Sequence, residues 1–552
     1  MKEYKILQNS EDIEMNMLQN RNLTKEEVNN LLVPTKKMVE NISNYKNLDI
    51  GIGMYLNAIE ERKQIATLVD VDADGYLSSA IAYNFTIDEM NYDNIVFILK
   101  DTKEHGLTDE IVDKLYTSNV KLLIIPDAGS ENYELLKKVS DFGIDILVLD
   151  HHIIEITQEQ QEALHNVVIV NNQDGQVENK YLSGTGVTYK FFNQVANRKG
   201  IKLKNKYIDC VAVSLITDVC NLKLSYENRY FLNEGSKPSK ITNPFIKFFV
   251  KKLKKGKSKF TITEIGFDIG PKINSIIRYG SIEEKEILFN SLIGCDELID
   301  GITYQEMAYK VGGKYQRSQR NAVKQIVPVI QEEIENNKLG NNSVIFVDST
   351  DIIKSNIRGL VCNKLIDIYK RPVMVLTLED GYYSGSARGY GQLDFKDFCE
   401  KTNLFEYCKG HSKAFGVSIK KENVPLFLDY CNKVLEVNDN EEVIIEKVYN
   451  EEIPLEDLLV VSEYEELWCN QIKAPVYLLT DVYLDSNSIK RTGNSTYVIK
   501  IGDITYVKEF CSLARYNDIL QAIEQEGKLK VDILVQFRKG KKAYAKVLDI
   551  IY

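Results

Sequence analysis

The chain reads Thr67-Leu-Val-Asp70-Val-Asp72-Ala-Asp74-Gly75-Tyr-Leu-Ser-Ser79 where an apolar run ends in three carboxylates at alternate positions. An extended backbone sends alternate side chains to one face, so Asp70 and Asp72 share a face before the chain turns at Gly75 into a helix. Such carboxylates at the C-terminal end of a strand are typical of the ligand-binding edge of an open α/β sheet. Three like charges this close require protons or cations, and a hard divalent ion suits oxygen ligands. The alternative is a turn whose aspartates are solvated or cap the helix.

Apolar runs alternate with amphipathic segments from residue 64 to about residue 222, which predicts a parallel sheet of βαβ units. The predicted strands are 65–69, 95–99, 120–125, 144–149 and 167–170. Two more strands end in possible ligands, because Asp127 follows the third and Asp150, His151 and His152 follow the fourth. The chain has only five histidines, and an imidazole oriented by a neighbouring acid is a good metal ligand. The alternative is a hydrogen-bonded structural pair of histidines.

A further carboxylate, Asp218, follows the mostly apolar stretch 210–217. It would lie in a dry environment unless it is paired or bound to a metal. Two metal ions bridged by an aspartate and flanked by histidine can clamp the attacking and leaving oxygens of a phosphodiester. The residues by themselves therefore predict metal-assisted phosphoester hydrolysis.

Composition limits the class of protein. A net charge of −11 argues against a protein that coats nucleic acid with its whole surface, but it allows a local basic groove. The stretches 247–259 and 537–544 are local concentrations of basic residues, or else solvated helix faces and hairpin tips. The nine cysteines form no Cys-x-x-Cys pair, no apolar run is long enough to span a membrane, and the first residues lack a secretory apolar core. We therefore expect a cytoplasmic protein with reduced thiols and no membrane contact.

Changes of pattern divide the chain into five predicted segments, which are 1–60, 61–300, 301–340, 341–440 and 441–552. The first is expected to be helical, with Thr24 and Glu27 forming a capping box, and to cap the domain that follows. The second holds the parallel sheet, and the third is expected to be one long connecting helix. The fourth is a smaller α/β domain. The last alternates strands around one helix, which predicts an OB-fold barrel.

Two of these segments contain candidate nucleic-acid contacts. The fourth contains Ser384-Gly-Ser386-Ala-Arg388-Gly-Tyr-Gly, where small residues let backbone N–H groups and a guanidinium approach the same phosphate. The alternative is a glycine-rich hairpin with a surface arginine. In the last segment, aromatic residues could stack on bases, although aromatic residues in strands equally suit a barrel core. The candidates are Tyr497, Tyr506, Phe537 and Tyr544.

Four motifs resemble, in order, those of the DHH phosphoesterase superfamily. They are Asp70-Val-Asp-Ala-Asp-Gly75, Pro126-Asp-Ala-Gly129, Asp150-His-His152 and Thr217-Asp218. Glu227-Asn-Arg229 and residues 270–278 resemble stretches specific to the RecJ single-strand exonucleases, and residues 384–390 and 409–416 resemble the associated DHHA1 domain. The resemblance covers essentially the whole chain. It implies an α/β fold with a parallel-sheet DHH domain, a long connecting helix, a smaller α/β DHHA1 domain and a C-terminal β-barrel OB-like domain.

The resemblance also implies roles for individual residues. Two divalent ions, Mn²⁺ or Mg²⁺, would be bound by Asp70, Asp72, Asp74, Asp127, His151 and Asp218. Asp127 would bridge the ions, and His152 would act beside the scissile phosphate, so these two are the candidate catalytic residues. The substrate would be contacted by Lys100, Arg278, Ser386, Arg388 and His411. Among these, Ser386 and Arg388 would hold the 5′ phosphate, and His411 would lie near the cleft.

The implied activity is 5′-to-3′ degradation of single-stranded DNA to mononucleotides in repair or recombination, by a monomer whose protein partners would be a single-strand-binding protein or a helicase. Two alternatives remain open: a phosphodiesterase for short oligonucleotides or cyclic dinucleotides, and a catalytically weak DHH scaffold that binds single strands. The chain departs from the family pattern at three places. Lys100 replaces an arginine, Lys409 precedes Gly410-His411 where glycine is usual, and Tyr76-Leu77 follows Gly75.

Overall fold

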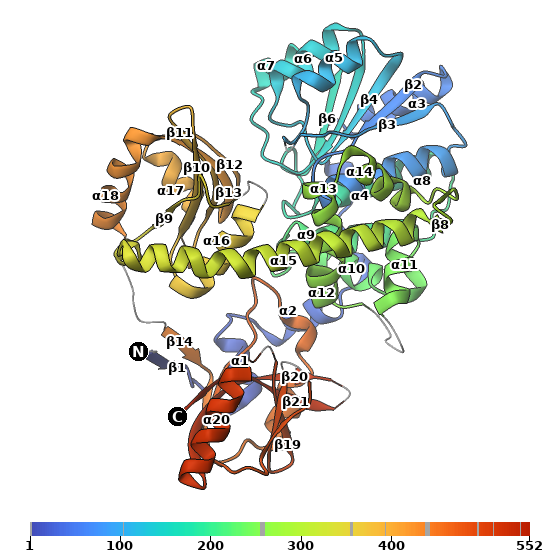
Figure 1. Cartoon of the computed structure of the whole chain (residues 1–552). Coiled ribbons are helices and arrows are strands. Elements are labelled where there is room, and N and C mark those ends of the chain that lie inside the picture. Colours follow the sequence, from blue (N-terminus) through green and yellow to red (C-terminus); the bar gives the residue numbers. More distant parts are fainter. Residues whose placement is uncertain are drawn as a thin grey trace. The chain divides into compact units, whose positions relative to one another are not determined.

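The computed structural model describes residues 3–102, 104–253, 260–353, 357–391, 393–435, 442–493, 496–509, 511, 513–540 and 542–552 (Figure 1). The chain forms two compact units. The larger comprises Glu3–Gly270, Glu286–Gln305 and Glu442–Tyr552, and the smaller comprises Pro271–Lys285 and Glu306–Glu441. The predicted α/β class is confirmed. The smaller unit begins within residues 61–300, and the larger unit joins residues near both ends of the chain. The five predicted segments stay predictions.

The larger unit contains a five-stranded parallel sheet with the strand order β3-β2-β4-β5-β6. The strands are β2 (Gln64–Leu68), β3 (Ile95–Ile98), β4 (Val120–Pro126), β5 (Asp145–Asp150) and β6 (Val167–Asn171), close to the predicted runs. From β2 the chain moves to β3 on one side and then returns to β4 on the other side. The C-terminal ends of β2 and β4 therefore form the topological switch point at which open α/β sheets bind ligands.

Helices cover both faces of this sheet, which explains why its strands are almost continuously apolar. They are α3 (Leu48–Glu60), α4 (Ala73–Asn84), α5 (Asp109–Tyr116), α6 (Tyr133–Asp141), α7 (Gln158–Glu162) and α8 (Gly184–Lys199). Apolar residues of α5 and α6 share one core with β2, β4 and β5, and α3 and α8 contact β4 and β5 as well (Figure 1). Further helices of this unit are α9 (Ile208–Thr217), α10 (Tyr226–Gly235), α11 (Pro244–Leu253) and α12 (Ile262–Glu264). The basic stretch 247–259 is described only as far as residue 253, within α11.

The N-terminal segment has two partners: residues 48–60 form α3, which packs on the parallel sheet as the expected cap would, whereas residues 3–32 join the C-terminal part of the chain. Strand β1 (Glu3–Ile6) pairs in parallel with β14 (Glu442–Ile445). Helices α1 (Ile13–Gln19) and α2 (Lys25–Leu32), the latter with the predicted capping box, bury apolar residues in the core of the C-terminal sheet. The reason is physical: an amphipathic pattern specifies that a helix buries one face, but not which partner covers it.

The C-terminal part of the larger unit is a seven-stranded sheet with the order β15-β16-β20-β21-β19-β18-β17, a β-rich region consistent with an OB-like domain. Its elements are β15 (Lys447–Asn450), α19 (Leu455–Ser462), β16 (Tyr477–Leu484), β17 (Ile489–Arg491), β18 (Tyr497–Ile501), β19 (Ile504–Lys508), α20 (Leu513–Glu526), β20 (Leu529–Lys539) and β21 (Ala543–Ile551). Three of the candidate base-stacking residues, Tyr497, Tyr506 and Phe537, are 2%, 0% and 1% exposed and belong to the core. Their assignment to base stacking was wrong, and the alternative of a barrel core holds. Tyr544 is half-buried.

The smaller unit contains a five-stranded sheet with the order β12-β13-β11-β10-β9. Its strands are β9 (Ile345–Asp348), β10 (Val373–Glu379), β11 (Tyr382–Arg388), β12 (Phe405–His411) and β13 (Ala414–Lys420). Helices α17 (Phe395–Lys401) and α18 (Val424–Val434) pack on one face, and α16 (Arg358–Tyr369) packs on the other. The predicted connecting helix is α15 (Tyr304–Asn336), which continues through Pro328. Two more helices, α13 (Gly270–Tyr279) and α14 (Ile282–Ile293), and a short hairpin of β7 (Leu298–Ile299) and β8 (Ile302–Thr303) precede it.

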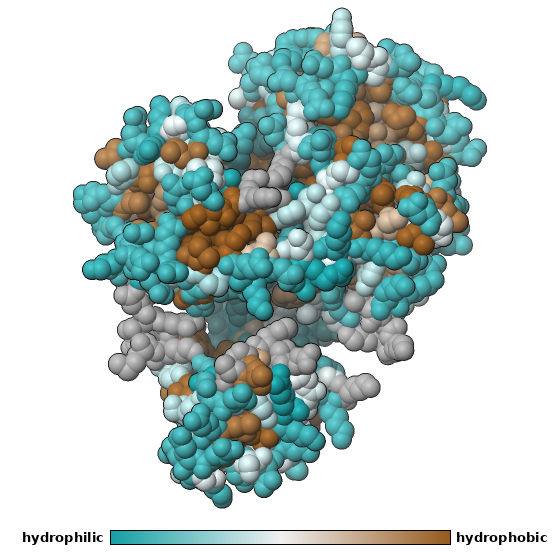
Figure 2. All heavy atoms as spheres, in the orientation of Figure 1, coloured by the Kyte–Doolittle hydropathy of each residue, from teal (hydrophilic) through white to brown (hydrophobic). Residues whose placement is uncertain are grey.

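The surface is largely hydrophilic on the face drawn in Figure 2, including the outward side of α15. The apolar residues Val327, Ile330 and Ile334 of this helix are buried in the core that α16 shares with β9 and β10. Within the described part of the chain, no helix combines the length and apolar character that crossing a membrane requires.

Candidate active site

The acidic side chains predicted to bind metal lie at the switch point of the larger sheet. Asp70 follows β2, Asp72 and Asp74 begin α4, and Asp127 follows β4. His151 and His152 follow β5, and Asp218 ends α9. Parallel strands and the helices after them bring these distant segments to one edge, as the strand-end argument predicted.

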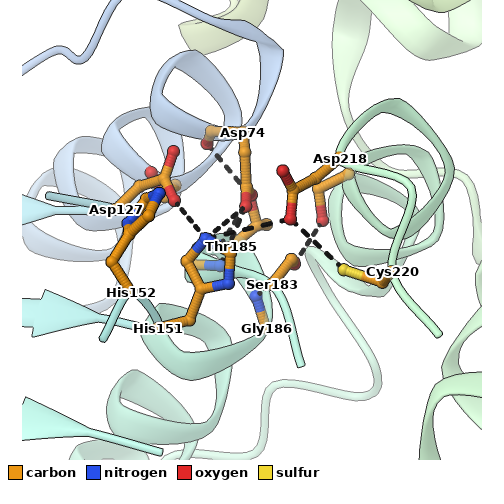
Figure 3. Close-up of polar contacts among 12 residues, drawn as sticks. Asp74, Asp127, His151, His152, Ser183, Thr185, Gly186, Asp218 and Cys220 are labelled. Atoms are coloured by element: carbon orange, nitrogen blue, oxygen red, sulfur yellow. Dashed lines mark hydrogen bonds and ion pairs between the residues drawn. The ribbon is translucent and has the colours of Figure 1, made fainter. Parts of the chain in front are cut away.

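Three carboxylates converge on the imidazole of His151. Its Nε2 atom lies 3.2 Å from Asp127 Oδ1, 3.8 Å from Asp218 Oδ2 and 3.9 Å from Asp74 Oδ2 (Figure 3). Ligand atoms of His151, Asp74 and Asp218 all lie within 4.8 Å of one another, which is a spacing that one metal ion can span. The structure therefore brings four of the six predicted metal ligands together.

The electrostatics of this cluster show an excess of negative charge. Burial, reinforced by Asp218, raises the pKa of Asp74 to about 6, and burial together with Asp74 and other carboxylates raises the pKa of Asp127 well above its ordinary value. Asp127 also has a left-handed backbone with φ of 65°, an uncommon conformation for a residue other than glycine. Its Oδ1 atom is buried without a hydrogen-bond partner. An orphaned carboxylate oxygen facing other acids and an imidazole fits a divalent cation, since oxygen and imidazole ligands suit Mn²⁺ and Mg²⁺.

The N-terminus of α8 holds Asp74 in place. The backbone N–H of Gly184 donates to Asp74 Oδ2 at 2.8 Å, the N–H of Thr185 donates to Oδ1 at 2.8 Å, and the Thr185 hydroxyl donates to Oδ1 as well. A Cβ atom on Gly184 would lie 2.2 Å from Asp127 Oδ1, so only glycine fits between the two carboxylates. Sequence reasoning missed this turn. Its available signal was Ser183, a helix-capping residue followed by small residues.

Asp218 is fixed by a separate local structure. It ends α9, and the next residue, Val219, has a φ of 55°, which is strained for a β-branched side chain. The Cys220 thiol donates to Asp218 Oδ2 at 3.4 Å. The turn at the end of the helix thus aims Asp218 at His151, and Cys220 is a contact that sequence reasoning did not find.

Asp70 has different partners from the other acids. Lys100 Nζ lies 2.7 Å from Asp70 Oδ1, His105 Nδ1 lies 2.5 Å from Oδ2, and the Gly106 N–H donates to Oδ1 at 2.8 Å. Burial raises the pKa of Asp70, but His105 and Lys100 outweigh it and keep that pKa below its ordinary value. Both oxygens are thereby engaged. The predicted roles of Asp70 in metal binding and of Lys100 in substrate binding stay predictions.

His105 was missed by sequence reasoning, although it is one of only five histidines and lies five residues after Lys100. Asp72 is the N-cap of α4, and its Oδ1 accepts a hydrogen bond from the Gly75 N–H at 2.9 Å. This agrees with the alternative in which an aspartate of this stretch caps the helix.

His152 forms a dyad with the buried Asp150. His152 Nδ1 lies 2.8 Å from Asp150 Oδ1, and Asp150 also accepts the backbone N–H groups of His151 and Ser130. Burial lowers the pKa of His152, but the charge and hydrogen bond of Asp150 outweigh it and raise that pKa to about 10. His152 is thus a fixed cation whose side chain is 38% exposed. Asp150 was not assigned to metal or substrate, but the sequence had indicated it as the acid that orients a neighbouring imidazole, and its contact with His152 agrees with that expectation.

The smaller unit brings together three of the predicted substrate contacts. Ser386 and Arg388 lie on β11, and Arg278 lies on α13. Burial, and also the positive charge of Arg278, lowers the pKa of Arg388. A Cβ atom on Gly359 would lie 2.6 Å from Arg388 Nη2 and 3.6 Å from Ser386 Oγ, so the first turn of α16 closes over this pair. His411 ends β12, and its side chain lies outside the described part of the chain.

Comparisons with known proteins agree on one family. The pattern described as "DHH family, N-terminal domain" matches residues 64–215. The chain is 31% identical over 533 residues to the putative SPbeta prophage-derived single-strand DNA-specific exonuclease YorK of Bacillus subtilis (strain 168), covering 91% of this chain and 89% of that protein. It is 23% identical to the single-stranded-DNA-specific exonuclease RecJ of the same strain, covering 75% of this chain and 50% of RecJ. The crystal structure of Thermus thermophilus RecJ in complex with Mn²⁺ shares the fold, with a TM-score of 0.72 at 16% identity, over 100% of this chain and 79% of that one.

Proposed function

We propose a function from a premise that the comparisons supply: the chain belongs to the RecJ-type family of DHH proteins. The proposed activity is metal-dependent hydrolysis of single-stranded DNA from the 5′ end to mononucleotides. The observation that carries it is the convergence of Asp74, Asp127 and Asp218 on His151 Nε2 at the switch point of the sheet.

Asp74, Asp127, His151 and Asp218 would hold divalent ions, and we propose two of them, Mn²⁺ or Mg²⁺, with Asp127 between them. Asp127 suits this role because its Oδ1 is buried and accepts no hydrogen bond. The chemistry that such ions supply when bound is Lewis-acid stabilisation of charge on the phosphoryl oxygens. The N–H groups at the start of α8 keep Asp74 oriented throughout.

His152 would act on the substrate as a hydrogen-bond donor. Asp150 holds its Nδ1, so Nε2 is the atom available to a phosphate oxygen. Because the pKa of His152 is about 10, the ring remains protonated at neutral pH and can stabilise negative charge that develops in the transition state.

The 5′ phosphate would bind at Ser386 and Arg388 in the smaller unit, and Arg278 of the same unit would contact the backbone of the strand. Guanidinium forks match phosphate oxygens, and no carboxylate pairs with either arginine among the described residues. Single-strand specificity is proposed from the relatives, whose names state it. In the cell, this activity would serve DNA repair or recombination, and a single-strand-binding protein or a helicase remain the proposed partners.

The test uses the purified protein with Mn²⁺ and three substrates: a 5′-labelled single strand, a 3′-labelled single strand and a duplex, with a chelator as control. We expect labelled mononucleotide at once from the 5′-labelled strand, progressive shortening of the 3′-labelled strand, and no reaction with the duplex or in chelator. Cleavage confined to oligomers of a few residues would contradict the proposal and favour a short-oligonucleotide phosphodiesterase. Binding without cleavage would favour the scaffold alternative.

A further inference from the structure

The middle of helix α15 carries positive charge and no acid. Residues 307–331 contain five cations and no aspartate or glutamate, although the whole chain has a net charge of −11. The first of the five, Lys310, forms an ion pair with Glu306. The other four are exposed, and within the part of the chain that the structure describes no carboxylate forms an ion pair with them. We call these four the basic stripe: Lys314, Arg317, Arg320 and Lys324.

The basic stripe lies on one side of the helix. Because an α-helix turns by about 100° and rises by about 1.5 Å per residue, the four positions fall within about 120° around the axis and extend about 15 Å along it. Gln316 and Gln319 are buried on the other side. A Cβ atom on Gly313 would lie 3.4 Å from Arg317 Nη1, so this guanidinium extends one turn back along the helix over the glycine. The cations therefore form one continuous surface within the smaller unit.

The same side of α15 offers further groups that bind phosphates. Ser318, Asn321 and Gln325 are exposed between the cations. Arginine, lysine, serine, asparagine and glutamine are among the side chains with which proteins contact the phosphates of DNA. None of the exposed residues from 314 to 325 is aromatic, so this side lacks the rings on which proteins stack the bases of a single strand. These features suit the backbone of a duplex, whose bases are stacked inside the helix.

A basic stretch of the larger unit shows how the basic stripe differs from balanced surface charge. In the stretch 537–544, Arg538 and Lys539 lie 3.2 Å and 2.6 Å from carboxylate oxygens of Glu465 and Glu463. The protein itself balances these two charges. The basic stripe has no such partner among the described residues, so a polyanion bound there would displace only small counterions. Because a protein of net charge −11 repels DNA over most of its surface, such a local concentration of cations determines where a duplex can bind.

We propose that the basic stripe binds the phosphate backbone of duplex DNA without reading its sequence. The choice of DNA as the polyanion rests on the proposed function. The binding itself goes beyond that function, because the duplex is held and not cleaved. A protein that holds a duplex on one surface and degrades a single strand at another acts best on a single-stranded end that is attached to a duplex.

The experiment measures binding in chelator by fluorescence anisotropy, with blunt-ended duplexes of two unrelated sequences. We expect the parent to bind both equally at low salt, because phosphates carry no sequence information. Arg317→Gln and Arg320→Gln together remove two charges and introduce good helix formers, so the helix should survive. This double variant should bind duplex about tenfold more weakly. The slope of log affinity against log salt should fall by about 1.8, as expected for two lost phosphate contacts on B-DNA.

A matched control removes the same total charge from the same unit. Lys401→Ala and Lys433→Ala together replace two exposed lysines, which form ion pairs with Asp397 and Asp429. Because these charges are already balanced, duplex affinity and its salt dependence should remain those of the parent.

The remaining outcomes would contradict the inference or separate it from the proposed function. A parent that does not bind duplex at low salt, an equal loss in the control, or a loss confined to single strands would overturn the assignment. A polyglutamate chain that bound the stripe more tightly than a duplex of equal charge would make it a docking surface for an acidic protein segment instead. If the parent bound duplex through the stripe but showed no Mn²⁺-dependent hydrolysis of single strands, the proposed function would fail and this inference would stand.

Discussion

The acidic site of the larger unit and the arginines Arg358 and Arg388 beside β11 of the smaller unit, which we call the cationic region, are two charged regions of opposite sign. In the first, burial raises the pKa values of Asp74 and Asp127, which disfavours their negative charge. In the second, burial lowers the pKa values of Arg358 and Arg388, which disfavours their positive charge. Each region therefore has charges that its own surroundings do not neutralise. The opposite signs fit the opposite ligands that we propose, namely cations for the first and phosphates for the second.

Buried charges elsewhere in the larger unit show that this lack of compensation is confined to particular places. Lys190 and Glu227 form a buried ion pair at 2.7 Å, with exposed fractions of 5% and 3%. Asn179 also donates to Glu227. A buried charge that has a partner and hydrogen bonds costs little, whereas one without a partner costs several kcal/mol. The fold thus can pair a buried charge, as Lys190 and Glu227 show, and this supports our proposal that divalent cations balance the carboxylates of the acidic site.

The largest expected effect comes from removing the orphaned carboxylate of the acidic site. Asp127→Asn should lower Mn²⁺-dependent nuclease activity by about a thousandfold or more, because an amide cannot supply the anionic ligand. Asparagine tolerates the left-handed backbone of this position, so the fold should survive. Nuclease assays and single-strand binding in chelator would be measured together, with the surface variant Asp141→Asn as control. Unchanged activity would contradict the assignment of Asp127 as a metal ligand of the acidic site.

The next effect concerns the cation inside the acidic site. Asp150→Asn should reduce activity about a hundredfold at neutral pH, because it removes the group that keeps His152 protonated. The parent should retain the His152 contribution until the pH approaches its pKa of about 10. The variant should instead lose activity as the pH rises through neutrality, since the pKa of His152 falls toward its ordinary value. The pH profile is the measurement, and Asp145→Asn, at the start of the same strand, is the control. If the pH profiles of the parent and of Asp150→Asn had the same shape, Asp150 would not be the group that keeps His152 protonated.

The two regions were not equally predictable from the sequence. The acidic site was largely predictable, because most of its ligands follow apolar strands. The order of a parallel sheet brings the ends of such strands together. Asp74, Asp127 and His151 meet for this reason, whereas Asp218 reaches them from the end of helix α9. The start of α8 was not predictable, because the role of Gly184 depends on Asp74 and Asp127 approaching it from other segments.

The cationic region was only half predictable from the sequence. Ser386 and Arg388 are recognisable as small residues around an arginine, but Arg358 gains its place only when α16 packs on β11. The aromatic residues of the C-terminal sheet illustrate a second limit. Alternation along a strand divides its residues between two faces, yet it does not say which face is buried. Tyr506 is in the core because the neighbouring strands and helices cover its face of the sheet, which the sequence of its own strand does not specify.

A smaller effect should appear in the stability of the metal-free protein. The pKa of Asp74 is about 6 in the folded state and has its ordinary value of 3.8 when unfolded. A raised folded pKa means that stability is present at low pH and is lost as the pH rises from about 4 through 6, by on the order of 2–3 kcal/mol. Thermal unfolding in chelator at pH 5 and pH 7 would measure this loss, and Mn²⁺ should stabilise more at the higher pH. The variant Asp74→Asn isolates the contribution, and an equal pH dependence in that variant would contradict it.

The smallest effect tests whether the cationic region recognises the form of the phosphate. Arg388→Ala should reduce the preference for a 5′-phosphate over a 5′-hydroxyl end by about tenfold, which corresponds to one charge-assisted contact. Arg388→Lys should lose part of this preference, because an ammonium keeps the charge but lacks the fork that matches two phosphate oxygens. Binding of both oligonucleotides would be measured in chelator, so that the acidic site does not contribute through metal. If Arg388→Ala lowered the affinity for the 5′-phosphate and the 5′-hydroxyl oligonucleotide equally, Arg388 would act through general electrostatic attraction. The cationic region would then not recognise the terminal phosphate as such.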